Sequence, residues 1–338
     1  MTNSHLQSCF PAEYPDSQGP YQHAGTYRFF DTTVHSQLLL PELSDCGDIT
    51  PSVTVRQAAA GEVSPDAFKT RYEWRDDAGR LICRCGRRGD DYALCLPGQA
   101  SFFITAGGAI EYLPAPGVGE GLLRHLLLNQ VLPRYLAHVG KLLLHASAVT
   151  LPSGRSVAFL GDSGYGKSTL ASYCHLEGAH IVDDDCILLR SDERGASLVG
   201  GVPTLRLYPD SMRALGHDAM GFEPYTDDSS KQQMRLATHS LPPPRPRHLD
   251  ALFLLGAPPP TAGEGVRVEP VDGREALMPI LGSVFNLDPT DPRAISRTFT
   301  RVAQVLDGGL PVYHLHYPRE HSALPQVLQA LQRCLSGV

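Results

Sequence analysis

Residues 157–169 read Val-Ala-Phe-Leu-Gly-Asp-Ser-Gly-Tyr-Gly-Lys-Ser-Thr, and this stretch decides the fold. The apolar residues 157–160 predict a short buried strand, and the residues after Lys167 have the apolar spacing of a helix. Between them, residues 161–168 match the pattern G-x-x-x-x-G-K-S/T of a phosphate-binding loop. A strand, a glycine-rich turn and a helix in this order predict an α/β domain that binds a nucleotide.

The loop is suited to the phosphates of a nucleoside triphosphate. Its glycines let successive backbone N–H groups turn inward, and the following helix adds its positive N-terminal end. Lys167 would bring a charge to the outer phosphates, and the Ser168 hydroxyl would ligate Mg²⁺. The sequence therefore predicts ATP and Mg²⁺ as cofactors. The candidate nucleotide-binding residues are Gly161, Asp162, Ser163, Gly164, Tyr165, Gly166, Lys167, Ser168 and Thr169.

Three carboxylates, Asp183, Asp184 and Asp185, end the next apolar segment along the chain. Adjacent carboxylates repel one another unless a cation or a proton intervenes. Beside a phosphate loop, this pattern predicts that one carboxylate holds the metal and another takes the proton of an attacking hydroxyl. The alternative is a solvated acidic turn or a helix cap.

His145 precedes the loop in what we expect to be a hairpin of residues 141–151 and 156–160. If the turn centres on residues 153–154, paired residue numbers add to 307, and His145 faces Asp162 at the entrance of the loop. A histidine there could bind phosphate or position the acceptor. The alternative is a hydrogen-bonded core histidine.

These segments resemble one family. His-Ala-Ser-Ala-Val at 145–149, the loop, and Gly-Ala-His-Ile-Val-Asp-Asp-Asp at 178–185 look like the catalytic core of the HPr serine kinase/phosphorylase group. That fold is related to phosphoenolpyruvate carboxykinase. The likeness is tight over residues 142–190 and loose afterwards. It extends to shorter, divergent kinases of lasso-peptide biosynthetic clusters.

The resemblance implies a P-loop core of the HPr kinase/phosphoenolpyruvate carboxykinase type. It also implies that His145 and Asp184 are catalytic, and that Asp185 helps to hold Mg²⁺ with Ser168. Arg206 and Lys231 fall in a region where family members contact phosphate or acceptor, and they join the candidate site.

Two departures narrow the activity that the resemblance implies. Thr169 stands where the bifunctional enzymes carry a glutamate, and the region before residue 140 shows no sign of their regulatory domain. We therefore expect a kinase that moves the γ-phosphoryl group of ATP to a serine of a peptide or protein, with a lasso-peptide precursor as the favoured acceptor. The alternatives are an ATP-binding regulatory switch or scaffold without phosphotransfer, and a kinase of an HPr-type phosphocarrier protein.

The chain divides into three expected regions. Residues 1–25 are rich in Pro, Ser, Gln and Tyr and predict a loose tail. Residues 26–140 predict a mostly antiparallel β region closed by a helix at 119–139, which Pro133 kinks. Residues 141–338 form the expected P-loop kinase domain. Asp291-Pro292 is expected to cap a helix with Ile295, Phe299, Val302 and Leu306 on one apolar face, and a last helix is predicted over 322–335. Later strands are predicted at 251–255 and 312–317. Expected strands of the β region are 27–30, 37–40, 80–85, 92–96, 101–105 and 109–113.

Charge and composition exclude several classes. The 36 acidic residues outnumber 29 basic ones, so no overall positive field attracts nucleic acid or an anionic membrane. No apolar run approaches the ~20 residues of a membrane span, and no secretory signal starts the sequence. The eight cysteines lack metal-site or disulfide spacing, and we expect Cys83 and Cys85 to be reduced thiols on one strand face. A cytoplasmic enzyme with a serine-bearing peptide or protein as partner is expected, with a homo-oligomer left open.

Overall fold

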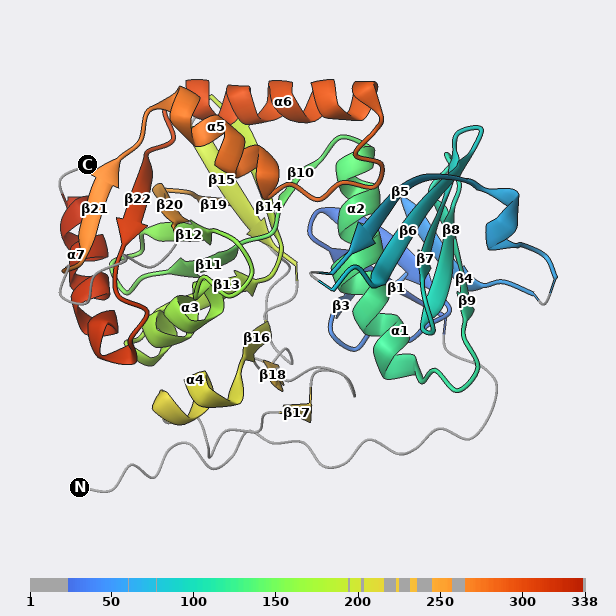
Figure 1. The fold of residues 1–338 in the computed structure, drawn as a ribbon, viewed down its shortest axis with the longest axis horizontal. Helices are drawn as coiled ribbons and strands as arrows, with labels where there is room; N and C mark the ends of the chain where they lie inside the picture. The colour runs from blue at the N-terminus through green and yellow to red at the C-terminus, as the bar shows by residue number, and fades with distance from the viewer. Residues whose placement is uncertain are drawn as a thin grey trace.

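The structure, a computed structural model, describes residues 24–59, 61–76, 78–193, 195–201, 204–215, 223–224, 232–235, 245–256 and 265–336. Within these residues the fold is mixed α/β, with strands in sheets of nine, six, four and three strands (Figure 1). Of the tail predicted for residues 1–25, residues 1–23 lie outside the described part of the structure. Lys231 lies outside it as well.

A six-stranded sheet in the order β13-β11-β12-β20-β22-β21 carries the candidate loop. Its strands are β11 (Ser147–Thr150), β12 (Ser156–Leu160), β13 (His180–Asp184), β20 (Ala251–Leu255), β21 (Arg267–Pro270) and β22 (Val312–His316). β12, β20 and β22 are parallel neighbours. β11 is antiparallel to both β12 and β13, so β13 runs in the same direction as β12. The carboxyl ends of β12, β13, β20 and β22 therefore meet at one edge.

Both faces of this sheet are covered, which explains the unbroken apolar run before the loop. Val157 and Phe159 of β12 pack in a core with helices α3 (Lys167–Leu176) and α7 (Leu324–Ser336). Ala158 and Leu160 pack on the opposite face, in a core with α5 (Gly273–Gly282), α6 (Pro292–Asp307) and the four-stranded sheet. The strands of that sheet are β10 (Leu142–Leu144), β14 (Ile187–Asp192), β15 (Gly195–Gly200) and β19 (Arg247–His248).

The N-terminal region forms the nine-stranded sheet, in the order β3-β1-β2-β4-β9-β8-β7-β6-β5. Its strands are β1 (Gly25–Phe29), β2 (Thr32–Ser36), β3 (Ser44–Asp45), β4 (Val53–Gln57), β5 (Lys69–Arg75), β6 (Leu81–Arg88), β7 (Asp91–Leu96), β8 (Ala100–Ile104) and β9 (Ala109–Pro114). Only its pairs β2/β4 and β4/β9 are parallel, so the prediction of a mostly antiparallel region is confirmed. The strand predicted at 37–40 is wrong: after β2 the chain turns, and the Ser36 hydroxyl bonds the backbone of Leu38.

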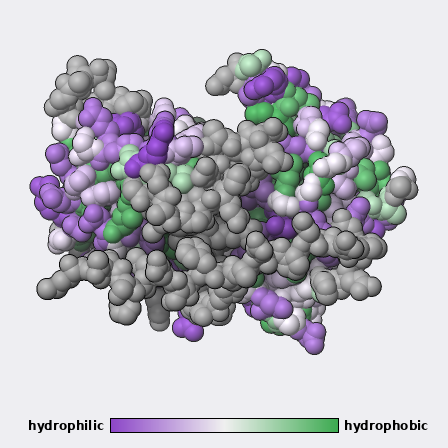
Figure 2. Space-filling view, turned by 90° about the horizontal axis from the view of Figure 1, so that it is seen from below, coloured by the Kyte–Doolittle hydropathy of each residue, from purple (hydrophilic) through white to green (hydrophobic). Residues whose placement is uncertain are grey.

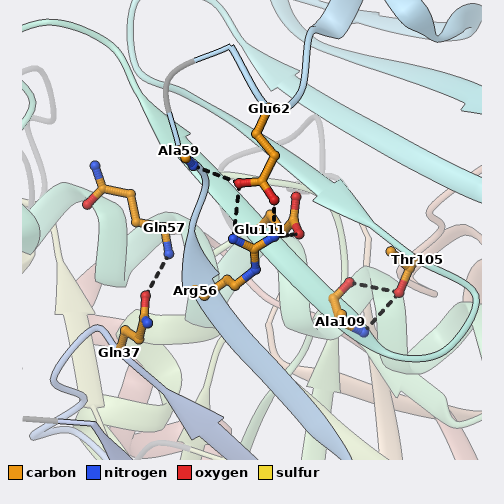
Figure 3. A network of polar contacts seen from close by, with 8 residues as sticks. All are labelled: Gln37, Arg56, Gln57, Ala59, Glu62, Thr105, Ala109 and Glu111. Carbon is orange, nitrogen blue, oxygen red and sulfur yellow. Dashed lines mark hydrogen bonds and ion pairs between the residues drawn. The ribbon is translucent and has the colours of Figure 1, made fainter.

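An ion-pair network links β4 to β9 in the middle of this sheet (Figure 3). Arg56 of β4 contacts Glu111 of β9 and also bonds Glu62, whose Oε1 lies 2.6 Å from the Arg56 Nη2. The backbone N–H of Ala59 donates to Glu62 at 2.9 Å. The hydrogen bond from Arg56, helped by that of Ala59, lowers the pKa of Glu62 to about 2. Glu62, in the segment after β4, is therefore ionised at neutral pH and holds the Arg56 side chain beside β9.

The helix predicted at 119–139 is confirmed, with a kink of a particular kind. It consists of α1 (Glu120–Leu126), a π-helical segment η2 (Leu127–Val131) and α2 (Leu132–His138), which has Pro133 in its first turn. Proline lacks an N–H group, so a helical hydrogen bond is lost at Pro133. The wider π turn lies directly before this position. Figure 1 shows this helical stretch beside the nine-stranded sheet, on the side that faces the rest of the molecule.

The N-terminal region and the remainder of the chain share a core. Leu143 of β10, Leu188 of β14 and Leu287 are buried in one cluster with the nine-stranded sheet and the α1–α2 helix. At the same boundary, Asp31 contacts both Lys141 and Arg190. Apolar packing and ion pairs therefore join the regions on either side of residue 140.

The buried face predicted for α6 needs correction. Val302 is buried as expected, but Ile295 and Phe299 are each 48% exposed, and Ala294 and Val305 are buried in their place. α6 packs against α5, β10 and β14. These neighbours bury a face of the helix that is rotated about its axis from the face with the largest apolar side chains. The N-cap predicted at Asp291 is confirmed, since its carboxylate accepts from the backbone N–H of Arg293.

Smaller elements complete the described structure. They are the short helices η1 (Pro65–Ala67), α4 (Pro209–Ala214) and η4 (His321–Ala323), and the three-stranded sheet of β16 (Thr204–Leu207), β17 (Glu223–Pro224) and β18 (Gln232–Arg235). On the face in Figure 2, the coloured hydrophobic residues form small separate groups among hydrophilic ones. Among the described residues, no helix is long and apolar enough to cross a membrane.

Cys83 and Cys85 are both buried in the core of the N-terminal region and neither forms a disulfide. Burial raises the pKa of Cys83 to about 11 and that of Cys85 to about 12. Both side chains are therefore protonated thiols at neutral pH, which confirms the expectation for this pair.

Candidate functional site

A pocket of about 200 Å³ lies at the sheet edge where the carboxyl ends of the parallel strands meet. Eight residues singled out in the sequence line it: His145, Ser163, Gly164, Gly166, Lys167, Ser168, Thr169 and Asp185. The structure thus brings together residues from the loop, from the segment before β11 and from the segment after β13.

The candidate phosphate loop joins β12 to α3 and needs glycine at both ends. A Cβ on Gly161 would lie 2.7 Å from the carbonyl oxygen of Leu255 on the neighbouring β20. Gly166, the N-cap of α3, has φ +86°, and a Cβ there would lie 3.0 Å from the hydroxyl of Tyr317. Glycine at both positions therefore lets the loop lie close to Leu255 and Tyr317, and the positive N-terminal end of α3 begins at the pocket.

Lys167 is the first residue of α3, and its side chain folds back over the loop. Its Nζ donates to the carbonyl oxygens of Gly161, at 2.7 Å, and Asp162, at 3.2 Å. The residue is only 7% exposed and also lines the pocket. An ammonium group in this position holds the loop in shape and places a positive charge where an anionic ligand would lie.

His145 stands where the chain leaves one sheet for another. The single strand expected over 141–151 is wrong, because β10 pairs with β14 while β11 pairs with β12. Ser147 pairs with Phe159, so paired numbers add to 306 rather than 307, and His145 lies outside the ladder. Its backbone N–H donates to the Ser283 carbonyl oxygen at 2.7 Å, which diverts the chain between the two sheets.

The imidazole of His145 faces the acidic segment. Its Nδ1 lies 3.0 Å from the backbone carbonyl oxygen of Asp185. The ring also lines the pocket, so it is neither a surface histidine nor one sealed in the core. The hydrogen bond orients the ring beside the pocket, as a histidine that contacts a ligand requires.

The three aspartates occupy different environments. Asp183 is buried and accepts from the backbone N–H groups of Asp185, Cys186 and Gly201, at 3.1, 3.2 and 2.7 Å. Asp184 is 0% exposed, and its Oδ1 accepts from the Ser147 hydroxyl at 2.6 Å. Asp185 is half-buried and lines the pocket, which Asp184 does not. The first carboxylate shapes the turn, the second is buried behind the pocket, and the third reaches it.

The remaining predicted residues lie in other positions. Gly161, Asp162 and Tyr165 belong to the loop without lining the pocket, and Tyr165 packs on the core beneath α3. The backbone of Arg206 lies in β16, paired with Gln233. Its side chain is outside the described part of the structure, as is all of Lys231. Both residues therefore stay predictions.

The pocket also contains residues that the sequence analysis missed. They come from α4 with the residue that precedes it and from the segment after β22: Tyr208, Ser211, Tyr317, Arg319, Glu320 and His321. The Arg319 guanidinium lies 3.9 Å from the ring centroid of Tyr317 and donates to the Gly256 carbonyl oxygen at 2.6 Å. The carboxyl ends of parallel strands are the usual place for ligands in α/β sheets, and that rule could have drawn attention to the residues after 317.

Ser168 and Asp185 fit a magnesium site. Both offer oxygen atoms, which Mg²⁺ prefers, and both line the same pocket. Among the described residues, no cluster of three His, Cys, Asp or Glu side chains could hold a metal by itself. Protein sites for Mg²⁺ commonly use one or two carboxylates together with substrate phosphates and water. Ser168 and Asp185 therefore suit a metal that arrives with a nucleotide.

Comparison with known proteins gives little further guidance. No family model matches the sequence, and no curated protein matches it. Among solved structures, the HPr(Ser) kinase/phosphatase of Coxiella burnetii is similar over 57% of this chain and 97% of its own, with 14% identity and a TM-score of 0.29. Because the sequence identity and the TM-score are both low, this likeness establishes no activity. What the site can do follows from its own geometry.

Proposed function

We propose that this protein is an ATP- and Mg²⁺-dependent kinase that transfers the γ-phosphoryl group to a serine hydroxyl of a peptide or protein. One observation carries the proposal: the glycine-rich loop, Lys167, Ser168, Asp185 and His145 line a single pocket. A loop that only turned the chain would not require a buried lysine, a histidine and a carboxylate at the same place.

The nucleotide would bind with its phosphates in the loop. Backbone N–H groups of the loop and the positive end of α3 would face the phosphate oxygens, and Lys167 would bring its charge to the outer ones. Ser168 and Asp185 would hold Mg²⁺, which when bound neutralises charge on the phosphates. Arg206 and Lys231 remain candidates for further phosphate or acceptor contacts.

The transfer needs a hydroxyl, a base and an in-line geometry. The serine oxygen would form a bond to the γ-phosphorus while the bond from that phosphorus to the β–γ bridging oxygen breaks, leaving ADP. The hydroxyl proton would pass to Asp184, the catalytic base that the sequence resemblance implies. His145 would position the acceptor at the pocket, since its ring is oriented by the carbonyl of Asp185.

For the acceptor we propose a serine of a biosynthetic precursor peptide of the lasso-peptide kind, modified in the cytoplasm. This choice rests on the sequence resemblance and on the departures at Thr169 and in the N-terminal region. An HPr-type phosphocarrier protein is the alternative acceptor. Mass spectrometry after incubation with ATP and Mg²⁺ would compare precursor peptides with a phosphocarrier protein; an added phosphate on a peptide serine supports the proposal.

One observation favours a second candidate function, an ATP-binding switch without phosphotransfer. Asp184 is 0% exposed and does not line the pocket, so nucleotide could bind without a base in contact with any acceptor. The same experiment separates the two candidates. Calorimetric binding of ATP with no phosphorylated product from any tested peptide or protein would favour the switch.

A further inference from the structure

A second cavity, of about 380 Å³, lies at the boundary between the nine-stranded sheet and the rest of the molecule. We call it the aromatic cavity. Tyr72 and Trp74 of β5 line one wall, and Arg134 of α2 lines another. Phe285, in the segment after α5, and His145 also line it. His145 also lines the pocket beside the phosphate loop, which we call the nucleotide pocket, so this residue borders both cavities.

The rings of the aromatic cavity form a continuous path to His145. Tyr72 and Trp74 meet edge to face, with centroids 5.0 Å apart. The Arg134 guanidinium lies 5.4 Å from the Trp74 centroid and 5.8 Å from that of Phe285. Phe285 in turn meets His145 edge to face at 6.1 Å. An apolar group held against these rings would lie next to the proposed site of phosphotransfer.

The Arg134 cation lacks a matching anion in the described structure. Its Nη1 donates to the carbonyl and side-chain oxygens of Gln130, at 2.9 and 2.6 Å. Its Nε is shielded from solvent with no hydrogen-bond partner, and no described carboxylate forms an ion pair with it. The nearby thiols of Cys83 and Cys85 stay protonated because burial raises their pKa. A shielded guanidinium without a counter-charge is costly, and a bound carboxylate would relieve that cost.

We propose that the aromatic cavity binds the acceptor peptide, with an apolar side chain against Trp74 and Phe285 and a carboxylate on Arg134. The accepting hydroxyl then lies at His145, on the border with the nucleotide pocket. The ligand is a peptide that carries an apolar side chain and a carboxylate beside its serine. Naming this peptide as acceptor rests on the proposed kinase function, whereas its binding does not. The N-terminal sheet thereby acquires a role in substrate recognition.

Trp74 is the only tryptophan in the sequence, so its fluorescence reports on this cavity without any catalysis. The first probe is the end-capped peptide acetyl-Phe-Asp-Ser-Gly-amide, titrated into the full chain without ATP. A second probe carries Asn in place of Asp, and a third carries that Asn and a free C-terminal carboxylate. We expect a saturable change with the first probe and about 10- to 100-fold weaker binding of the second, the range for a lost hydrogen bond between charged groups.

The third probe tells which carboxylate Arg134 prefers: recovered binding points to a chain terminus, and weak binding to an acidic side chain. Equal affinity for the first two probes, or no saturable change at millimolar peptide, overturns the proposal. Substitution Arg134→Met should remove the preference for the charged probe, and Arg134→Lys should keep part of it. The matched control is Arg333→Met, which removes an exposed arginine of α7. Melting curves confirm that each variant is folded.

The kinase proposal and this inference can fail separately. If no peptide is phosphorylated but the charged probe binds through Arg134, the cavity is a peptide site and the kinase proposal fails. If peptides are phosphorylated and Arg134→Met leaves the KM for an acidic peptide unchanged, the kinase proposal stands and the inference is wrong. A correct inference predicts a KM for that peptide raised about 10-fold or more, with the ATP affinity unchanged.

Discussion

The Ser147 hydroxyl donates a 2.6 Å hydrogen bond to Oδ1 of Asp184, and both residues are buried. This contact joins β11 to the end of β13, directly behind the pocket that Asp185 and His145 line. A carboxylate held by a hydroxyl keeps a fixed direction and a dry environment. Such a group is a precise proton acceptor only where an acceptor hydroxyl can reach it, which makes Asp184 the most informative position to change.

Asp184→Asn tests the proposed base. The amide keeps the size and can still accept from Ser147, but it lacks the charge that draws a proton from a hydroxyl. Phosphopeptide formation should fall about 10²- to 10⁴-fold, the usual contribution of general-base assistance. ATP affinity, measured by calorimetry, should stay the same or rise because a negative charge near the phosphates is gone. A wild-type rate of peptide phosphorylation would exclude Asp184 as the base.

Lys167→Ala tests the phosphate loop. The change removes a positive charge from the pocket and two hydrogen bonds that hold the loop carbonyls. ATP affinity and turnover should both collapse, while the apolar core around β12 keeps the protein folded. Titration calorimetry with ATP measures the loss, and the matched control is Lys69→Ala, which removes an exposed lysine that lines neither cavity. Unaltered affinity in the Lys167 variant would show that the loop does not bind phosphates.

Asp185→Asn tests the metal site. The neutral amide is a weaker Mg²⁺ ligand than a carboxylate, whereas the backbone carbonyl that bonds His145 is retained. ATP affinity in the presence of Mg²⁺ should drop to its value without the metal. The readout is ATP binding at increasing Mg²⁺ concentrations. If affinity rises with Mg²⁺ as strongly as in the wild type, Asp185 is not a ligand.

Gly166→Ala tests the geometry of the loop. A left-handed backbone conformation costs a non-glycine residue roughly 1–2 kcal/mol, and the new methyl group would press on the Tyr317 hydroxyl. We expect a slightly lower melting temperature and a much larger loss of ATP affinity, since the loop amides and the start of α3 must shift. Gly154→Ala is the control, because that turn glycine also has positive φ but has open space around it. Equal ATP affinities in both variants would contradict the prediction.

Asp31→Asn tests the ionic link across residue 140. Burial by itself would raise the pKa of Asp31, but hydrogen bonds from Lys141 and Arg190 outweigh it and lower the pKa below the ordinary 3.8. The ionised side chain therefore stabilises the folded state above that ordinary value, and its contribution disappears as pH falls through the lowered pKa. At neutral pH the variant should lose about 1 kcal/mol of unfolding free energy.

Denaturant unfolding of both proteins across the acid range measures this dependence. The difference between wild type and Asp31→Asn should be constant near neutrality and shrink at acidic pH. A difference that does not change with pH would mean that the carboxylate charge contributes nothing.

Local patterns were sufficient for much of the fold. The strands at 156–160 and 251–255, the kinked helix, and the Asp291 cap follow from apolar periodicity and residue-specific backbone preferences. The break at His145 did not, because Leu142–Leu144 and Ser147–Thr150 are both buried strands and only their pairing partners separate them. The prediction of the buried face of α6 was wrong for a similar reason, because the elements that pack on the helix determine which side is buried.

In the candidate site, too, some residues could be predicted from the sequence and others are placed by the fold. The sequence by itself determined the loop from Gly161 to Ser168 and the acidic segment, because backbone turns and charge spacing are local properties of a chain. Only the tertiary structure decided that Asp185 lines the pocket while Asp184 is buried, and that Tyr317 and Arg319 lie beside the loop. The order of parallel strands brings distant segments to one edge, and that order is set by packing across the whole sheet.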